Sequence, residues 1–127
     1  MGHETTIRSF RDLRVWQSAM DLVEQIYIAT RTFPKHELYG LASQMQRAAV
    51  SIPSNIAEGH TRAHSKEYLQ HLSVARGSLA ELQTQLEIAL RLKYCSAADI
   101  GQLITQADSL GKQLYTLRNA ITKNTGP

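Results

Sequence analysis

The chain has 127 residues, of which 43% are hydrophobic, 6% are aromatic and three are proline, and its net charge is +3. This length fits one domain, and the small aromatic fraction disfavours an all-β fold. No apolar run approaches the roughly 20 residues that cross a bilayer, so we expect neither a membrane span nor a signal peptide. The single cysteine, Cys95, excludes an internal disulfide, which fits a reducing cytoplasm. The positive charge permits attraction to polyanions without requiring it.

The first helix that the apolar pattern predicts covers about 11–32. Apolar residues recur there at alternating steps of three and four, which is typical of a helix that buries one stripe. This stripe consists of Leu13, Trp16, Met20, Val23 and Tyr27. Ser9 and Asp12 have the spacing of a capping pair at the start. The helix is expected to stop at Phe33, because the following Pro34 pushes it out of helical geometry.

The second predicted helix covers about 38–58 and contains a proline. Its stripe consists of Leu38, Leu41, Met45, Ala48, Ile52 and Ile56. Pro53 lacks an N–H group, so the carbonyl of Ala49 loses its partner, and we expect the helix to kink or break there. Gly59 is expected to close the helix as its C-terminal cap.

The third predicted helix, at about 65–93, is the longest. Its stripe consists of Tyr68, Leu72, Ala75, Leu79, Leu82, Leu86 and Ala89. Gly77 lies in mid-helix, where glycine costs about 1 kcal/mol relative to alanine. We therefore expect another helix to approach closely at this point, beside Ala75 and Ser78.

The fourth predicted helix covers about 97–123 and starts with the capping pair Ser96 and Asp99. Its stripe consists of Ile100, Leu103, Ala107, Leu110, Leu114, Leu117 and Ile121. The connections between the four helices are short, so neighbouring helices should be antiparallel. The sequence therefore predicts an all-α protein, an antiparallel up-down-up-down four-helix bundle over residues 10–123. The segments 1–9 and 124–127 lack periodicity and are expected to be flexible.

A second apolar stripe runs beside the first one on the N-terminal helix. It consists of Val15, Ala19, Leu22 and Ile26. The third helix likewise carries the additional apolar residues Leu69, Ile88, Leu90 and Leu92. One seam needs an apolar stripe of only about 100°, and large exposed apolar patches are rare on monomers. We therefore expect Val15, Ala19, Leu22 and Ile26 to form an interface between copies of the chain, the alternative being a wide internal core.

Several blocks of sequence, in order, carry a resemblance to one family. They are Phe10-Arg11-Asp12-Leu13, Val15-Trp16, Phe33-Pro34, Glu37-Leu38-Tyr39-Gly40-Leu41, Gln44-Met45, Arg47-Ala48-Ala49, Ser51-Ile52-Pro53-Ser54-Asn55-Ile56-Ala57-Glu58-Gly59, Gly77-Ser78-Leu79 and Glu81-Leu82-Gln83-Thr84-Gln85-Leu86. The chain resembles the four-helix bundle proteins named after the intervening sequences of bacterial 23S rRNA genes. Two positions depart from the pattern: Gln46 stands where a second arginine is expected beside Arg47, and Gln83 replaces a frequent glutamate.

The resemblance implies a cytosolic bacterial protein whose four-helix subunits commonly form a ring of five. It also implies kinship with the accessory proteins of diversity-generating retroelements, which are barrel-shaped pentamers with a basic surface that engage a reverse transcriptase and nucleic acid. Possible partners are therefore further copies of the chain, RNA or DNA, and a reverse transcriptase or another protein. Gln46 thins the basic surface and weakens this transfer of nucleic-acid binding.

The candidate nucleic-acid residues are basic, because phosphate binding depends on summed positive charge. They are Arg8, Arg11, Arg14, Arg47, Arg62 and Lys66, and the remaining basic residues, among them Arg76, Lys112, Arg118 and Lys123, are scattered along the sequence. In a single copy such a scatter is a normal solvated surface. A fivefold ring would multiply even a weak charge cluster.

The block Ser51, Pro53, Ser54, Asn55, Glu58 and Gly59 is the other candidate site. We interpret it as structural: Ser54, Asn55 and Glu58 could turn inward to bond the freed carbonyl or a neighbouring subunit. The spacings of His60, His64, His71 and Glu67 could bring two or three metal ligands together. His64 and His71 are seven positions apart, which is too far for one tetrahedral zinc site without a partner chain, and bundle metal sites use a Glu-x-x-His step of three, whereas Glu67 and His71 are four apart.

No nucleophile with a base at a recognisable spacing, no glycine loop for phosphate and no carboxylate pair occurs. We therefore expect a non-enzymatic homo-oligomeric adaptor without cofactor or metal, whose basic surface binds nucleic acid, a protein partner, or both. The alternative is a structural or protein-binding scaffold without affinity for nucleic acid. An enzyme that uses the region of His60 to His71 is the least favoured hypothesis.

Overall fold

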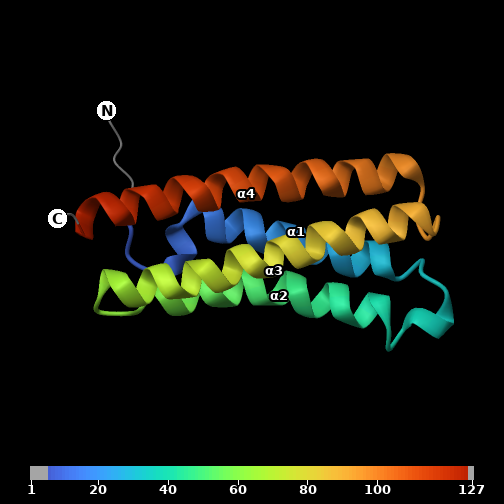
Figure 1. The fold of residues 1–127 in the computed structure, drawn as a ribbon, viewed down its shortest axis with the longest axis horizontal. Coiled ribbons are helices and arrows are strands. Elements are labelled where there is room, and N and C mark those ends of the chain that lie inside the picture. Colours follow the sequence, from blue (N-terminus) through green and yellow to red (C-terminus); the bar gives the residue numbers. More distant parts are fainter. Residues whose placement is uncertain (1–5, 126–127) are drawn as a thin grey trace.

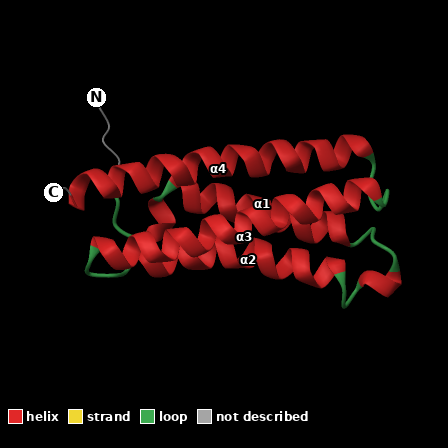
Figure 2. Cartoon of the chain, in the orientation of Figure 1, coloured by secondary structure: helices red, strands yellow, loops and turns green. Residues whose placement is uncertain are grey.

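The computed structural model describes residues 6–125, and these form four long helices and two short helical turns. The long helices are α1 (Arg14–Thr30), α2 (Leu41–His60), α3 (Ser65–Arg91) and α4 (Ala97–Thr125), and the turns are η1 (Phe10–Asp12) and η2 (Lys35–Glu37). No residue in the described range forms a strand (Figure 2). Successive helices run in opposite directions along one long axis (Figure 1). Each helix packs against its two neighbours in the order α1, α2, α3, α4 and back to α1. The all-helical bundle is therefore confirmed.

The start of α1 lies three residues later than predicted, because the capping pair serves a separate turn. The Ser9 side chain accepts the N–H of Arg11, and the Asp12 carboxylate accepts the N–H groups of Arg8 and Ser9 at 2.8 and 3.2 Å. These backbone bonds lower the pKa of Asp12. Leu13 then has an extended backbone, with ψ of 126°, which interrupts the helical path before α1 begins.

The connection from α3 to α4 shows why α3 ends two residues before the predicted boundary. Lys93 has φ of 60°, in the left-handed region that glycine usually occupies at helix ends. The N–H of Tyr94 bonds the carbonyl of Ala89, and the N–H of Lys93 bonds that of Leu90. These two bonds close the helix as a Schellman motif with lysine in place of glycine. At the far side of the connection, the Ser96 hydroxyl accepts the N–H of Asp99, as the predicted cap requires.

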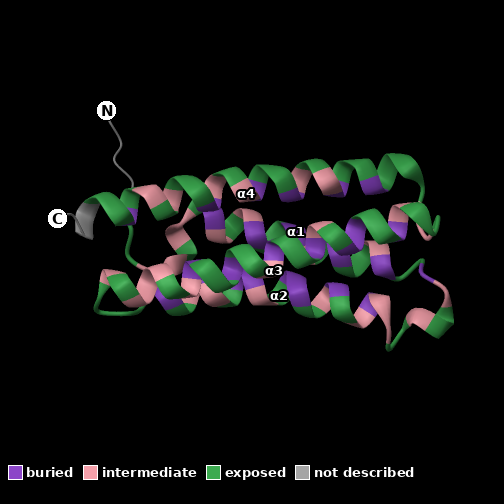
Figure 3. Cartoon of the chain, in the orientation of Figure 1, coloured by how far each residue is buried: buried purple, intermediate pink, exposed green. Residues whose placement is uncertain are grey.

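The core contradicts the predicted orientation of α1. Val15, Ala19, Leu22 and Ile26, which the sequence assigned to an interface between copies, lie inside the single subunit with exposed fractions of 7% or less. They belong to the hydrophobic core of the described residues, and Figure 3 shows buried segments along all four helices. The stripe expected to be buried is only partly so: Trp16 and Val23 are half-buried, while Met20 and Tyr27 are 39% and 41% exposed. The internal-core alternative is therefore correct for these four residues.

On α3 the additional apolar residues divide between core and surface. Leu69 and Leu90 pack against the core, whereas Ile88 and Leu92 are exposed. The expected close approach at Gly77 is wrong, because an added Cβ would meet no atom within 4 Å. Gly77 faces open space on the outer surface of α3.

Helix α2 runs unbroken from Leu41 to His60 with Pro53 inside it, so a break at the proline is wrong and a bend there stays a prediction. Gly59 does not cap the helix either, because the helix continues past it to His60 and no described glycine has a positive φ. At the other end of the chain, α4 extends to Thr125, so the expected flexible tail is partly helical. Residues 1–5 and 126–127 of the predicted flexible ends lie outside the described residues.

The N-terminus of α2 is held by a carboxylate from η2. Glu37 Oε1 accepts the N–H of Leu41 at 3.0 Å, and its Oε2 accepts the Tyr94 hydroxyl at 2.7 Å. The bond from Leu41, followed by the bond from Tyr94, lowers the pKa of Glu37, while the same carboxylate raises the pKa of Tyr94. One side chain thus links the start of α2 to the connection between α3 and α4.

Replacing Glu37 with glutamine should reduce the acid sensitivity of the fold. A carboxyl whose folded pKa is depressed stabilises the protein above its ordinary pKa, and this stabilisation is lost as the pH falls through the folded pKa. The wild type should therefore be more stable than Glu37→Gln at neutral pH, and the difference should shrink below the ordinary value of 4.5. This difference in stability is measured by the urea unfolding midpoints of both proteins from neutral pH to below pH 4.5. A difference independent of pH would contradict the assigned role.

Candidate functional site

The family-like block of α2 joins α3 through a line of polar side chains. Ser78 of α3 donates its hydroxyl to Ser51 Oγ at 2.8 Å, and Asn55 Nδ2 donates to the same oxygen at 3.1 Å and to the Ser51 carbonyl at 2.9 Å. Asn55 Oδ1 then lies 3.1 Å from His71 Nδ1. Because His71 and Ser78 are seven residues apart, they lie on one face of α3. This line of four side chains fixes the register between α2 and α3.

Gly59 lies at a close approach of the same two helices. A Cβ on this residue would lie 2.9 Å from both His71 Cβ and Tyr68 Cδ1, and 3.3 Å from the Tyr68 carbonyl oxygen. The ring of the next residue, His60, packs edge-on against Tyr68, with centroids 5.9 Å apart. Any side chain larger than hydrogen at position 59 would push the helices apart.

The remaining residues of the block have other environments. Pro53 is buried, whereas Ser54 and Glu58 are exposed. Of the three side chains expected to turn inward, only Asn55 does so, and it bonds Ser51 and His71 instead of the carbonyl of Ala49. The contacts of the block among the described residues are therefore those of helix packing.

The two departures from the family pattern both contribute contacts between helices. Gln46 Nε2 donates to the buried hydroxyl of Thr30 at 3.0 Å, linking α2 to α1. Gln83 Nε2 donates to Asp108 Oδ1 at 3.0 Å, linking α3 to α4. A glutamate at position 83 would place a second negative charge against Asp108, so glutamine suits this contact.

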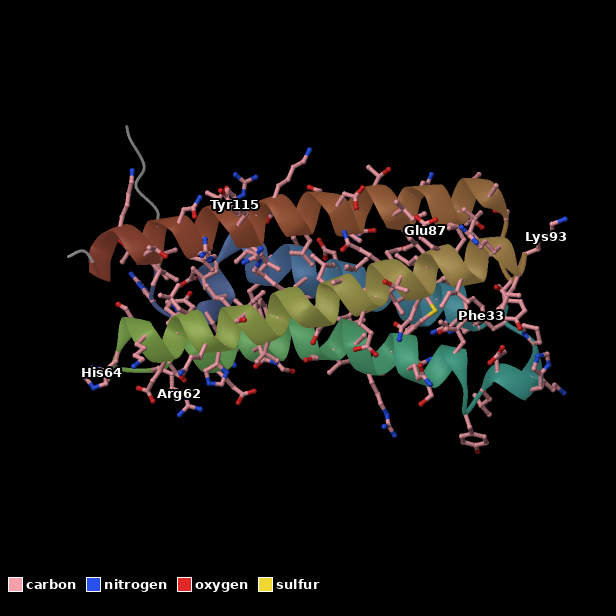
Figure 4. The ribbon with its side chains drawn as sticks, viewed as in Figure 1. Phe33, Arg62, His64, Glu87, Lys93 and Tyr115 are labelled. Carbon is pink, nitrogen blue, oxygen red and sulfur yellow. The ribbon has the colours of Figure 1, made fainter. Side chains whose placement is uncertain are left out.

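The antiparallel helices gather basic residues at one end of the bundle. Residues before and at the start of α1, the connection from α2 to α3, and the last turns of α4 all lie there; Figure 4 labels Arg62 and His64 at this end. We call this surface the basic end and define it by Arg8, Arg11, Arg14, Arg62, Lys66, Arg118 and Lys123, all exposed. Five of the six predicted nucleic-acid residues belong to it. Arg47, in the first half of α2, does not.

The cations of the basic end are not neutralised by ion pairs. Within the described part of the chain, the one ion pair within 4.0 Å joins His36 and Glu37, at the opposite end. Among the nearby acids, Asp12 has its carboxylate turned to backbone N–H groups. Arg11 lies over the ring of Phe10, 4.6 Å from its centroid. Arg118 donates to the side chain of Asn119 at 3.4 Å, and no described carboxylate lies within 4.0 Å of a cation of the basic end.

Sequence reasoning missed part of this surface. Arg118 and Lys123 are more than 50 positions from Lys66 in the sequence, so their spacing gives no sign that they belong to the same cluster. The antiparallel prediction itself contained the signal, since an even number of alternating helices returns the end of α4 to the start of α1.

Other chemistry has little support in the described residues. No group of three His, Cys, Asp or Glu side chains there could hold a metal ion, and no helix among them is long and apolar enough to span a membrane. A groove of about 590 Å³ runs between α1 and α4. Its lining includes Ser18, Asp21 and Ser109, and no hydrogen bond within the described residues joins Asp21 to either serine.

Comparisons with known proteins point to one family. Residues 11–116 match the model of the 23S rRNA-intervening sequence protein family. A protein of unknown function from the S23 ribosomal protein family of Bacteroides thetaiotaomicron has a similar structure, with a TM-score of 0.76 and 17% sequence identity over 83% of this chain and 95% of that one. At this identity the similarity shows the fold alone. A search of curated proteins found no match.

Proposed function

The chain belongs to the 23S rRNA-intervening sequence protein family, and from this premise we propose that it is a non-enzymatic, homo-oligomeric adaptor of the bacterial cytoplasm that binds nucleic acid through the basic end of its bundle. The observation that carries the proposal is the gathering of seven exposed cations from separate helix ends, without ion pairs among the described residues. Summed positive charge on one surface is what phosphate binding requires.

A second surface supports assembly with copies of the same chain. Trp16, Met20, Val23 and Tyr27 follow the outer side of α1, and Val50 of α2 is 40% exposed beside Tyr27, across a shallow pocket. We call this surface the α1–α2 face. Monomers rarely expose contiguous apolar patches of this kind. We propose that another copy covers it, in place of the interface that the sequence suggested.

Fluorescence anisotropy with short RNA and DNA across a salt series tests the nucleic-acid function. Binding should weaken as salt rises, because neutralised phosphates release their counterions. Replacing Arg11, Arg14, Arg62 and Lys66 with glutamine should lower the affinity at low salt at least tenfold. It should also reduce the slope of log K against log salt by about 3, given about 0.7–0.9 for each lost contact.

A matched control carries the same change of charge at the opposite end. Arg31, Lys35, Arg91 and Lys93 lie around the connections from α1 to α2 and from α3 to α4, and glutamine at these four positions should change affinity by less than about threefold. Equal losses in both variants would show that total charge, and not the basic end, attracts the nucleic acid. Absence of binding at low salt would refute the function.

A scaffold that binds protein alone is the second candidate. Leu38, Leu92 and Ile28 are 57%, 50% and 49% exposed near the end opposite the basic end. These side chains offer a protein partner apolar contacts that nucleic acid would not use. Two results would support this candidate. The wild type would show no affinity for polyanions, and replacing Leu38 and Leu92 with serine would abolish binding of its protein partner.

A further inference from the structure

The contact between Gln83 and Asp108 sets the register of α3 against α4. Gln83 Nε2 lies 3.0 Å from Asp108 Oδ1. One turn closer to the basic end, Gly111 of α4 faces Leu79 of α3, because a Cβ on Gly111 would lie 3.4 Å from Leu79 Cδ2. This second contact agrees with the register of the first. The two helices are antiparallel, so a step toward the N-terminus on α3 and a step toward the C-terminus on α4 lead in the same direction (Figure 1).

Two turns from that contact, the register places Arg76 opposite Tyr115. Arg76 precedes Gln83 by seven residues and Tyr115 follows Asp108 by seven, and residues seven apart share a helix face. Both pairs therefore lie on the same side of the α3–α4 seam, about 10 Å apart at 1.5 Å per residue. Figure 4 shows Tyr115 on the half of α4 nearer the basic end, whereas Glu87 lies toward the other end.

The side chain of Tyr115 is exposed to solvent and does not take part in the packing of the core. It is 55% exposed, and neither its ring nor its hydroxyl contacts a partner among the described residues. Tyr68 and Tyr94 differ, because each packs against another ring and hydrogen-bonds a neighbouring side chain. The ring of Tyr115 thus leaves an aromatic face free on the surface.

The surroundings of Tyr115 are cationic. Lys112 and Arg118 are three residues before and after it on α4, both exposed, and Arg76 is exposed across the seam. No aspartate or glutamate occurs in residues 68–80 of α3 or 109–123 of α4. The aromatic ring therefore lies among positive charges without a nearby carboxylate on either helix.

An accessible aromatic ring among cations is the arrangement that binds single strands, because an unpaired base stacks on the ring while phosphates meet the charges. Bases in a duplex are already stacked within the helix and do not reach such a ring. We infer that Arg76, Lys112, Tyr115 and Arg118 form a stacking site for single-stranded nucleic acid that continues the basic end along the α3–α4 seam. The inference rests on the nucleic-acid function proposed above and names the substrate class as single-stranded.

Anisotropy of the full chain at low salt tests the site with labelled oligouridine, the corresponding DNA strand and a hairpin duplex of equal phosphate number. The wild type should bind both single strands more tightly than the duplex. Tyr115→Leu removes the aromatic ring and should weaken single-strand binding about tenfold, which is about 1.4 kcal/mol. Its duplex affinity and its salt slope should not change. Tyr115→Phe keeps the ring and should stay within about twofold of the wild type.

Two further variants separate stacking from charge and from folding. Lys112→Gln should lower the salt slope on single strands by about 0.7. Tyr39→Leu, at a tyrosine that is 92% exposed near the opposite end, should bind like the wild type. Circular dichroism should show that all variants keep the helical fold.

The outcomes distinguish this site from the function on which it rests. If Tyr115→Leu binds single strands as well as the wild type, or if the wild type prefers the duplex, the stacking site is overturned while salt-dependent binding leaves the basic end in place. If the wild type binds none of the three probes at low salt, the proposed function fails and the site fails with it. An equal loss in Tyr115→Phe and Tyr115→Leu would also overturn stacking, because the ring is retained in the former.

Discussion

Replacing Leu22 with alanine should lower the free energy of unfolding by about 2–5 kcal/mol. Leu22 is fully buried in the core of a single subunit, and a leucine-to-alanine change there loses the transfer energy of the side chain and leaves a cavity. Urea unfolding followed by circular dichroism measures the loss. The effect should persist at protein concentrations low enough to dissociate any assembly, because the cavity lies within the subunit.

Met20→Ala is the matched control on the neighbouring side of α1. Met20 is 39% exposed on the α1–α2 face, so its loss should change subunit stability by no more than about 0.5 kcal/mol. It should instead weaken assembly, which light scattering reports as a lower mass at a given concentration. If Leu22→Ala leaves the subunit stable and only dissociates the protein, the core assignment is wrong. A wild type that scatters as a 14.2 kDa monomer would refute the assembly.

Gly59→Val should destabilise the fold by about 2–3 kcal/mol, the second largest effect that we expect. Its Cβ would meet His71 Cβ and Tyr68 Cδ1 at 2.9 Å and the Tyr68 carbonyl at 3.3 Å. The side chain of Tyr68 can rotate, but its backbone and the Cβ of His71 move only if α3 moves. Overpacking of this kind typically costs about 1–3 kcal/mol, and the two γ-methyl groups place valine toward the upper part of that range.

Gly77→Val provides the comparison for Gly59→Val. Both glycines are inside helices, but a Cβ at position 77 meets nothing within 4 Å. Valine is slightly better than glycine in a helix, so this variant should remain within about 0.5 kcal/mol of the wild type. Thermal unfolding of the two variants side by side isolates the cost of the close approach. Equal stabilities would show that the contact at Gly59 relaxes without cost.

The helices could be predicted from the sequence because their stripes have an unambiguous period. The choice of the buried stripe in α1 could not, since two apolar stripes lie side by side and both repeat at steps of three and four. A finer physical signal was present. Trp16 and Tyr27 carry polar groups that favour a position near water, whereas Val15, Leu22 and Ile26 carry none.

The ends of helices and the roles of glycines depended on contacts that no local pattern contains. Lys93 takes a left-handed conformation that its residue type does not suggest. Gly59 and Gly77 look alike in sequence, yet one lies against α3 and the other faces open space. Asn55 was identified as an inward-turning residue, but its partner His71 is 16 positions away and became visible only in the packed helices.

For the basic residues, by contrast, the predicted topology already contained the signal. An antiparallel prediction already brings Arg14, Arg62 and Arg118 to one end. The pairing of Arg76 with Tyr115 required more, because it depends on the register set by Gln83 and Asp108. Register between helices is determined by side-chain packing and therefore had to come from the structure.

The alternating course of the four helices also determines where foreign sequence can be attached. The chain enters the bundle near Ser9 and leaves it near Lys123, at the same pole as the cations (Figure 1). An affinity tag or fluorescent protein fused to either terminus would therefore lie close to the basic end and could block the surface where phosphates are expected to bind. A reporter inserted at the opposite pole, beside the exposed Tyr39, would leave that surface unobstructed.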